Sequence, residues 1–345
     1  MESTMLWIGT SSNDPGKGIY ALPCTGAPGN GEPALCQTVT NPSYIILSHD
    51  GRKLFSVSET MDNAAVVSYA VGSNNALTEI SRQPVLGKGP CHVACDRAAG
   101  VLLSANYGDG TVSVLPLRED GVIQPLSALV CHPAGGRFGP HAHCAVFSPD
   151  EKRIWVCDLG LDKLLCYRWE PFSRTIMLDH SLTLQLEEGK GPRHMLFHPA
   201  NGCAYLLDEL GSRVNTFLWD PDTGALTLRQ TLSLLPEDFT AHNGSAAVRC
   251  SGDGRFLYCS NRGHNSIAVY AIGEGGLLTL LQRADCGGDF PRDMDFEPGG
   301  NYLYVANQRS DTVDVLPVDK ATGLLGDTVA HYTVPSPTCI LFSKN

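Results

Sequence analysis

The chain has 345 residues and a formal net charge of −11 at pH 7, and 43% of its residues are hydrophobic. That apolar content can supply a sizeable core, whereas the negative balance argues against a nucleic-acid surface, which needs a basic patch. Only 18% of the residues are charged, while glycine (36) and proline (22) are plentiful. This profile is typical of a compact all-β protein with many turns.

The N-terminus, MESTMLWIGTSS, has no basic segment and only a short apolar run, so we do not expect a signal peptide. No stretch approaches the roughly 20 apolar residues of a membrane helix. The 13 cysteines show irregular spacing and no CxxC pair, which favours buried free thiols over a disulfide framework or a zinc site. We therefore expect a reducing, soluble compartment, most simply the cytosol.

Two apolar runs come first along the chain, LWIGT at 6–10 and GIYALPC at 18–24. A longer pattern then begins with NPSYIILSHDGRKLFSV and recurs at intervals of about 50 residues, which is typical of a propeller or solenoid. The copies begin at Asn41, Gly89, His141, Gly191, Gly244 and Phe290, and a shortened seventh copy, SPTCILFSKN, ends the chain.

Each full copy contains four short apolar runs separated by turns. The second run is KLFSVS at 53–58 or RIWVCD at 153–158, the third is SIAVYAI at 266–272, and the fourth is GLLTLLQRA at 276–284. Short β-branched and aromatic runs between Gly, Pro, Asn and Asp predict strands and hairpins. No segment has the periodicity of a helix longer than about two turns.

Seven first runs and four strands per copy predict one all-β domain, residues 1–345, folded as a seven-bladed β-propeller with four-stranded antiparallel blades. The last copy keeps only its first run. Its missing strands are expected from 6–10 and 18–24, so that N- and C-terminal strands together close the last blade and remove its free edge.

In a propeller the first strand of each blade lines the central channel, so one position of the first run is expected near the channel mouth. Across the copies it is occupied by Ser43, Cys91, His143, Arg193, Ala246, Arg292 and Thr338. Four of these residues are small, and three are cationic or titratable. The three large residues therefore break a column of otherwise small side chains.

The end of the second run gives two further columns. One contains Glu59, Tyr107, Leu159, Glu209, Arg262 and Gln308. The column just before it contains Ser58, Asn106, Asp158, Asp208, Asn261 and Asn307, and we interpret it as turn capping. A single arginine at a channel mouth can be merely solvated or ion-paired. The hypothesis of a functional site therefore depends on the whole set of charged residues.

The HxH pair, His141 and His143, raises the question of a metal. Catalytic zinc needs at least a third ligand, for which Glu209 is a candidate, but the surrounding arginines would repel a cation. We therefore expect neither a metal nor a cofactor. The sequence has no G-x-S-x-G elbow and no glycine-rich loop opening a helix, so nothing supports a serine nucleophile or a nucleotide site.

At these residues the chain resembles the lactonase family of seven-bladed propellers, which includes propeller-type 6-phosphogluconolactonases and fungal 3-carboxy-cis,cis-muconate lactonizing enzymes. The resemblance spans essentially the whole chain. It is carried by GPHAHCAVFSPD at Gly139, GKGPRHMLFHP at Gly189, LLDELGS at Leu206, SNRGHNSIAVY at Ser260 and FPRDMDFEPGGNYLYVANQ at Phe290.

The resemblance implies catalytic roles for His143, Arg193, Glu209 and Arg262, with His143 rather than His141 as the matching histidine. It also implies hydrolysis of 6-phospho-D-glucono-1,5-lactone. His143 would then be the general base, the arginines would bind the phosphate or the oxyanion, and Glu209 would orient an arginine or the histidine.

We expect His141, Arg292 and Gln308 to contact the substrate, with Arg292 completing the phosphate clamp. The expected partner is a small anionic lactone or carboxylate, with no nucleic acid and no membrane. Two alternatives stay open at this point. One is a muconate-type cycloisomerase, and the other is a non-catalytic propeller that serves as a platform for protein interactions.

Overall fold

The computed structural model describes residues 4–11, 18–24, 27–72, 76–98 and 100–343. Within these ranges the chain forms β-strands and one turn of 3-10 helix, η1 (Glu274–Gly276). None of the helical structure found there has the length and apolar character needed to cross a membrane. The strands assemble into seven sheets of consecutive antiparallel neighbours, and six of these have four strands.

The chain divides into two compact units. The C-terminal unit comprises Met1–Trp7, Leu22–Pro33 and Pro192–Phe342. The N-terminal unit comprises Ile8–Ala21, Ala34–Gly191 and Ser343–Asn345. The expectation of a single domain over 1–345 stays a prediction.

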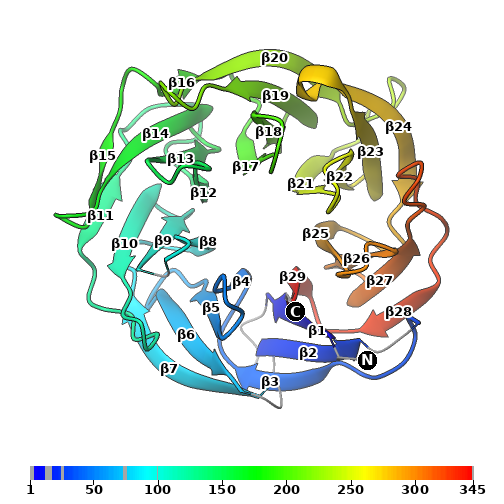
Figure 1. Cartoon of the computed structure of the whole chain (residues 1–345), viewed down its shortest axis with the longest axis horizontal. Coiled ribbons are helices and arrows are strands. Elements are labelled where there is room, and N and C mark those ends of the chain that lie inside the picture. The colour runs from blue at the N-terminus through cyan, green and yellow to red at the C-terminus, as the bar shows by residue number, and fades with distance from the viewer. Residues whose placement is uncertain (1–3, 12–17, 25–26, 73–75, 99, 344–345) are drawn as a thin grey trace. The chain divides into compact units, whose positions relative to one another are not determined.

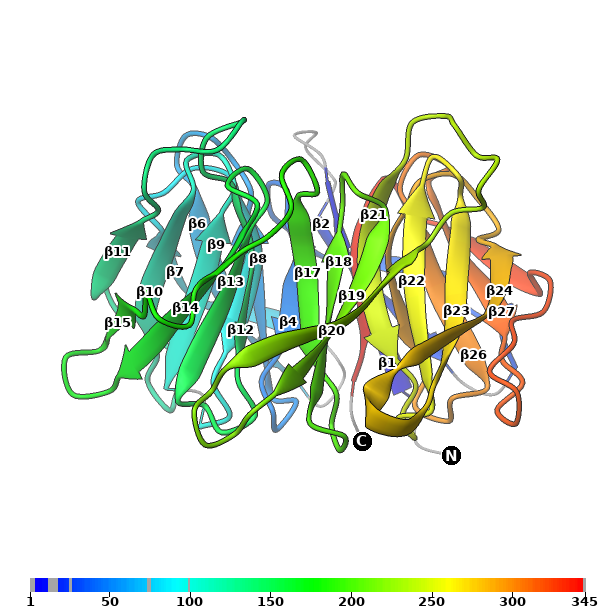
Figure 2. The ribbon, with the colours of Figure 1, turned by 90° about the horizontal axis from the view of Figure 1, so that it is seen from above.

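Three sheets of the C-terminal unit follow the chain strand by strand. The first contains β17 (Pro192–Phe197), β18 (Cys203–Asp208), β19 (Arg213–Trp219) and β20 (Leu226–Ser233). The second contains β21 (Gly244–Cys250), β22 (Phe256–Arg262), β23 (Ser266–Ile272) and β24 (Leu278–Asp285), whose first three strands run side by side in Figure 2. The third contains β25 (Pro291–Phe296), β26 (Tyr302–Asn307), β27 (Thr312–Pro317) and β28 (Ala330–Thr333).

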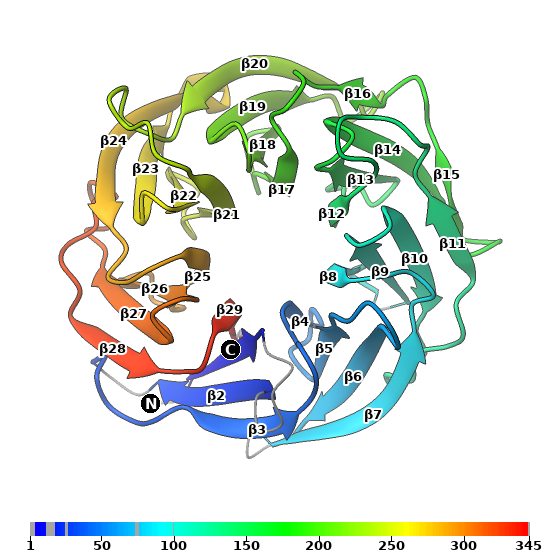
Figure 3. The same ribbon diagram turned by 180° about the vertical axis from the view of Figure 1, so that it is seen from behind.

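The N-terminal unit has the same construction. One sheet contains β4 (Ile45–Leu47), β5 (Lys53–Ser58), β6 (Ala65–Val71) and β7 (Leu77–Pro84), seen from behind in Figure 3. The next contains β8 (Pro90–Cys95), β9 (Val101–Asn106), β10 (Thr111–Pro116) and β11 (Ala128–Cys131). The third contains β12 (Ala142–Phe147), β13 (Arg153–Asp158), β14 (Lys163–Glu170) and β15 (Thr175–Leu178), with the short β16 (Leu184–Gln185) also paired to β14.

The seventh sheet has the order β29 (Pro337–Phe342), β1 (Thr4–Thr10), β2 (Gly18–Cys24) and β3 (Ala34–Thr38). The C-terminal strand therefore pairs with the first strand of the chain, as the truncated last repeat predicted. Seven antiparallel sheets, each with four strands in sequence and one with the short β16 added, confirm the predicted seven-bladed β-propeller class.

The first strands of successive sheets lie next to one another within each unit. In the C-terminal unit β17 contacts β21, β21 contacts β25, and β25 contacts β29 (Figure 1). In the N-terminal unit β4 contacts β8, and β8 contacts β12. Residues at equivalent positions of neighbouring first strands are thereby brought close together.

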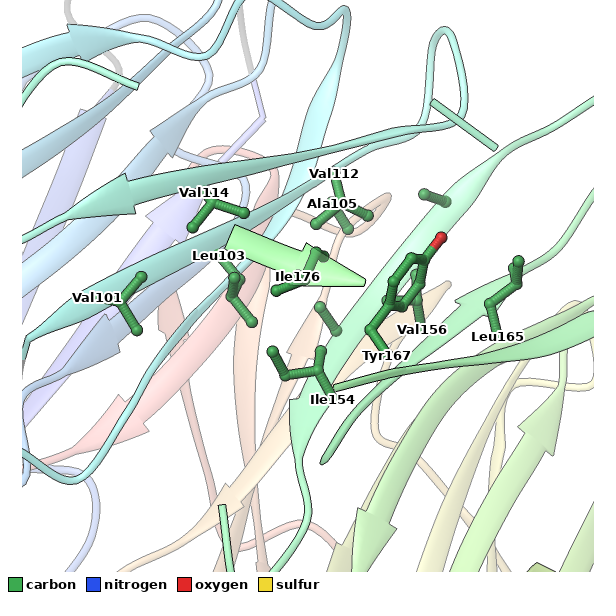
Figure 4. Close-up of a cluster of buried hydrophobic side chains, with 12 residues drawn as sticks. Val101, Leu103, Ala105, Val112, Val114, Ile154, Val156, Leu165, Tyr167 and Ile176 are labelled. Atoms are coloured by element: carbon green, nitrogen blue, oxygen red, sulfur yellow. The ribbon is translucent and has the colours of Figure 1, made fainter. Parts of the chain in front are cut away.

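Apolar side chains from facing sheets fill the space between them. In the N-terminal unit one such cluster (Figure 4) contains Val101, Leu103, Ala105, Val112 and Val114 from one sheet and Ile154, Val156, Leu165, Tyr167 and Ile176 from the next. The alternate residues Leu102 and Leu115 belong to a second cluster with Phe55 and Val57 of the preceding sheet. Because both faces of β9 and β10 are covered, every residue of these two strands is buried.

Two carboxylates of β25 hold the C-terminal strand from its other side. Asp293 accepts the backbone N–H of Ile340 at 3.1 Å, and Asp295 accepts that of Phe342 at 3.0 Å. Arg249 of β21 completes the arrangement, with its guanidinium 2.7 Å from Asp293. β29 is therefore fixed by a backbone ladder to β1 and by side-chain carboxylates of β25.

Truncating Leu103 to alanine should lower the free energy of unfolding by about 2–5 kcal/mol, because the fully buried side chain leaves a cavity between two sheets. Denaturant unfolding of the wild type and the variant measures the difference. Leu129→Ala on β11 is the control, since that side chain is 37% exposed and should change stability by about 0.5 kcal/mol or less. Equal effects of the two substitutions would contradict the described core.

The stability that the contacts between β25 and β29 provide should depend on pH because of the Asp295 carboxyl. Burial raises the pKa of this carboxyl to about 6. Folding therefore favours the protonated form of Asp295. The stabilising contribution of this side chain is complete below the ordinary aspartate pKa and is lost as the pH rises through about 6. Relative to wild type, Asp295→Asn should therefore gain stability as the pH rises from about 4 to about 7.

Urea unfolding of both proteins over that pH range measures this difference. Asp222→Asn, at an exposed turn of the same unit, is the control. A constant difference between wild type and Asp295→Asn across the range would contradict the prediction.

Candidate active site

The three large residues of the first predicted column lie at β-bulges, as does the small Cys91. The strand register shifts around Cys91 in β8, His143 in β12, Arg193 in β17 and Arg292 in β25. A bulged residue is left out of the ladder, and bulges often redirect side chains beside active sites. In β17 and β25 a proline (Pro192, Pro291) comes directly before the bulge. Proline has no N–H to donate to the ladder and is tolerated at the first position of a strand.

Glu209 links two arginines in the C-terminal unit. One carboxylate oxygen lies 2.8 Å from Nε of Arg193, and the other lies 2.9 Å from Nη2 of Arg262. The two guanidinium groups are almost completely buried, and the Glu209 side chain is 21% exposed. A carboxylate from the turn after β18 thus joins a bulge residue of β17 to the last residue of β22.

The start of β21 fixes both arginines from the backbone side. Arg262 donates to the carbonyl oxygens of Gly244 and Ser245, each at 3.1 Å, and Arg193 donates to that of Ala246. A Cβ atom at Gly244 would lie 3.2 Å from Nη2 of Arg262, so the glycine allows this close approach. The guanidinium groups are therefore held in fixed orientations without a ligand.

Positive charge outweighs negative charge around Glu209. Burial acts to raise the pKa of this carboxyl, but the nearby guanidinium groups outweigh it and hold the pKa below its usual value. In order of effect, they are Arg262, Arg193 and Arg292. Burial lowers the pKa of Arg262, and Arg193 acts in the same direction, whereas Glu209 opposes both. The cluster therefore favours binding of an anion.

Arg292 and Gln308 lie in the same region of the C-terminal unit. Arg292 is half-buried on β25 and acts on Glu209 through its charge. Gln308, just after β26, donates its backbone N–H to the carbonyl of Phe290 at 3.1 Å, and its amide group donates to Ser336 at 3.4 Å. The ring of Phe290 in turn lies 5.0 Å from the guanidinium carbon of Arg262.

His141 and His143 belong to the N-terminal unit, where both contact Tyr107. The ring of His141 stacks on that of Tyr107 at 4.5 Å, and the ring of His143 meets it edge-on at 5.7 Å. Nδ1 of His141 lies 2.7 Å from the carbonyl oxygen of Tyr107. Because a carbonyl oxygen can only accept, Nδ1 of His141 is the donor in this hydrogen bond.

Asp158 holds the backbone around His141. Its carboxylate accepts the N–H groups of His141 and Leu161, each at 2.9 Å, and its second oxygen lies 2.5 Å from Nδ1 of the buried His132. The bond to Leu161 confirms the predicted turn-capping role of this residue. A Cβ atom at Gly160 would clash with the carbonyl oxygen of Gly139 and lie 2.7 Å from the His141 ring, so only glycine fits there.

The structure thus brings Arg193, Glu209, Arg262, Arg292 and Gln308 together in one unit, and His141 and His143 together in the other. In the described part of the chain, no three His, Cys, Asp or Glu side chains are grouped as a metal site would need. The 13 cysteines all lie in the described residues, where they form no disulfide, and eight of them are buried.

Sequence reasoning did not single out Phe290 or Arg309, which complete the surroundings of Arg262. The Arg309 guanidinium lies 3.9 Å from the centre of the Phe290 ring. A signal for Arg309 was present in the sequence, because it is the one cation in the column that follows the second run. That column contains Thr60, Gly108, Gly160, Leu210, Gly263 and Arg309.

Comparison with known proteins gives consistent matches along the chain. A family model described as "Lactonase, 7-bladed beta-propeller" matches residues 5–342. The 6-phosphogluconolactonase of Bacillus subtilis (strain 168) is 33% identical over 343 residues, 97% of each chain. That of Yersinia pestis (strain Pestoides F) is 30% identical over 309 residues, 88% of this chain and 89% of the relative.

Solved structures agree with these sequence matches. The periplasmic gluconolactonase PpgL of Pseudomonas aeruginosa is 31% identical to this chain, with a TM-score of 0.93 and coverage of 99% of both chains. The fold, the motifs and the relatives lead to the same assignment. The chain belongs to the lactonase family of seven-bladed β-propellers.

Proposed function

We propose that this protein is a 6-phosphogluconolactonase, which hydrolyses 6-phospho-D-glucono-1,5-lactone to 6-phosphogluconate, the second step of the oxidative pentose phosphate pathway. Relatives that carry this name at 30–33% identity support the proposal. The observation that carries it is the network of Arg193, Glu209 and Arg262, which presents fixed guanidinium groups with an excess of positive charge. Such a site suits an anionic substrate whose reaction develops a further negative charge.

Lactone hydrolysis begins when water adds to the ring carbonyl and the carbonyl oxygen becomes an oxyanion. Guanidinium N–H groups that are already oriented stabilise this charge without having to reorganise. Arg193 and Arg262 meet this requirement because carbonyl oxygens of β21 and the Glu209 carboxylate fix both. Glu209 has the role of orienting the arginines and offsetting part of their charge.

An imidazole supplies the proton transfers. It takes a proton from the attacking water, and the resulting imidazolium returns a proton to the ring oxygen as the bond from this oxygen to the carbonyl carbon breaks. The product carboxylic acid then ionises and releases a proton to solvent. His143 is the residue that the family motif assigns to this role, and its assignment as the base stays a prediction.

Purified protein should accelerate hydrolysis of freshly generated 6-phosphogluconolactone above the spontaneous rate, measured by acid release, both with and without a chelator. Loss of the acceleration on chelation would instead point to a metal at the HxH pair. If no acceleration occurs, the proposal fails. Conversion of 3-carboxy-cis,cis-muconate would then support the cycloisomerase alternative.

His143→Ala should retain the fold and reduce kcat by about 100-fold or more, because the reaction loses its general base. Circular dichroism and denaturant unfolding check the fold, and acid release measures turnover. His49→Ala, at an exposed turn of the same unit, is the control and should turn over normally. Near-normal turnover by a well-folded His143→Ala protein would rule out this histidine as the base.

Glu209→Gln should lower the free energy of unfolding by up to about 3 kcal/mol at neutral pH, because two buried guanidinium groups lose their shared carboxylate. The pKa of Glu209 is lowered in the folded protein, so its contribution is present above the ordinary glutamate pKa and is lost as pH falls. Unfolding curves of wild type and variant should therefore converge in acid.

The matched control is Glu237→Gln, which removes the same charge from an exposed loop of the same unit. A Glu209→Gln protein as stable as this control at pH 7 would contradict the structural role of the ion pairs.

A further inference from the structure

We propose that Arg292 and Arg309 form a subsite for the phosphate group of the substrate, and that Phe290 fixes its position beside the Arg193–Glu209–Arg262 network. The inference rests on the proposed function and deepens it, because it assigns different arginines to the two ends of the substrate. Arg193 and Arg262 serve the lactone carbonyl, and Arg292 and Arg309 serve the phosphate.

The two pairs of arginines differ in whether a carboxylate offsets their positive charge. Both oxygens of Glu209 are engaged, one by Arg193 and the other by Arg262. Among the residues described, Arg292 and Arg309 have no carboxylate within ion-pair distance. A phosphomonoester carries a charge of about −1.5 to −2 at pH 7 and three acceptor oxygens, so two unpaired guanidinium groups match it.

The Phe290 ring connects Arg309 to the buried network. Its centroid lies 3.9 Å from the Arg309 guanidinium carbon and 5.0 Å from that of Arg262. The two guanidinium carbons are therefore no more than about 9 Å apart, a separation on the scale of a single sugar phosphate. Arg262 is 6% exposed, whereas Arg309 is exposed, so a ligand can reach Arg309 directly.

The backbone at Phe290 is strained and firmly held. Its φ angle is +67°, a left-handed conformation that is unusual for a bulky residue. Asn265 accepts its N–H at 3.1 Å, and the N–H of Gln308 donates to its carbonyl, also at 3.1 Å. Strain of this kind persists where surrounding contacts enforce it, most often at functional sites.

The same turn sets the positions of both proposed phosphate ligands. Arg292 follows Phe290 by two residues, at the bulge of β25. The Arg309 backbone N–H donates to the carbonyl of Asp289 at 3.1 Å, and the Asp289 carboxylate accepts the Asn265 amide at 2.7 Å. The segment that carries Arg292 and the segment that carries Arg309 are thus joined through the hydrogen-bonded turn at Phe290.

The test compares two lactones that differ only in the phosphate. For Arg309→Gln, kcat/KM with 6-phosphogluconolactone should fall about tenfold or more, mainly through a higher KM. With unphosphorylated glucono-1,5-lactone the fall should be far smaller. Arg229→Gln, which removes the same charge from an exposed position of β20, should change neither value. Equal losses on both lactones would overturn the subsite while leaving the proposed function intact.

A binding measurement decides the subsite even if the protein hydrolyses no lactone. Calorimetric titration with 6-phosphogluconate, and separately with inorganic phosphate, should show binding to wild type that weakens about tenfold in Arg309→Gln. Arg309→Lys, which keeps the charge but loses the forked donor, should bind with intermediate affinity and guards against a folding defect. Absence of phosphate binding to wild type, or unchanged affinity in Arg309→Gln, would overturn the proposal.

Discussion

The middle sheet of each unit, β8–β11 in one and β21–β24 in the other, has apolar side chains on both faces, so it must be covered by a neighbouring sheet on either side. β9 and β10 show this requirement most clearly, because alternate residues of these strands join two different hydrophobic clusters. Burial of this kind leaves little room for polar chemistry within the sheets. The charged residues of the candidate site are found instead at bulges and at or just beyond strand ends, where the backbone ladder is interrupted.

Electrostatics then determine what the C-terminal unit can bind. One carboxylate, Glu209, faces three guanidinium groups, two of which it contacts directly. An arrangement with more cations than anions is costly for the unliganded protein, and an anion relieves that cost. The same imbalance that weakens the free protein would therefore provide binding energy for the anionic substrate that we propose. The backbone carbonyls of β21 keep the arginines in place while no anion is bound.

The sequence was sufficient to predict the seven sheets, their four-stranded order and the pairing of the two ends, because the repeats show the same pattern seven times. Comparison of equivalent columns also selected Arg193, Glu209, Arg262 and Arg292, which the structure places together. It could not give the contacts among them, since these join side chains from different strands and loops. Nor could it give the left-handed backbone of Phe290 or the proton position on His141, which depend on bonds to Asn265, Gln308 and Tyr107.

The bulges described in the first strands have a consequence for how such a protein can change over time. A bulged residue lies outside the strand ladder, so its replacement alters no register and moves no core side chain to the opposite face. Cysteine, histidine and arginine all occupy this position in one chain while the sheets around them keep the same pairing. Each repeat with such a bulge thus offers one position where a side chain can be replaced with little effect on folding. Duplicated sheets could in this way acquire different side chains, and hence new substrates, through single substitutions.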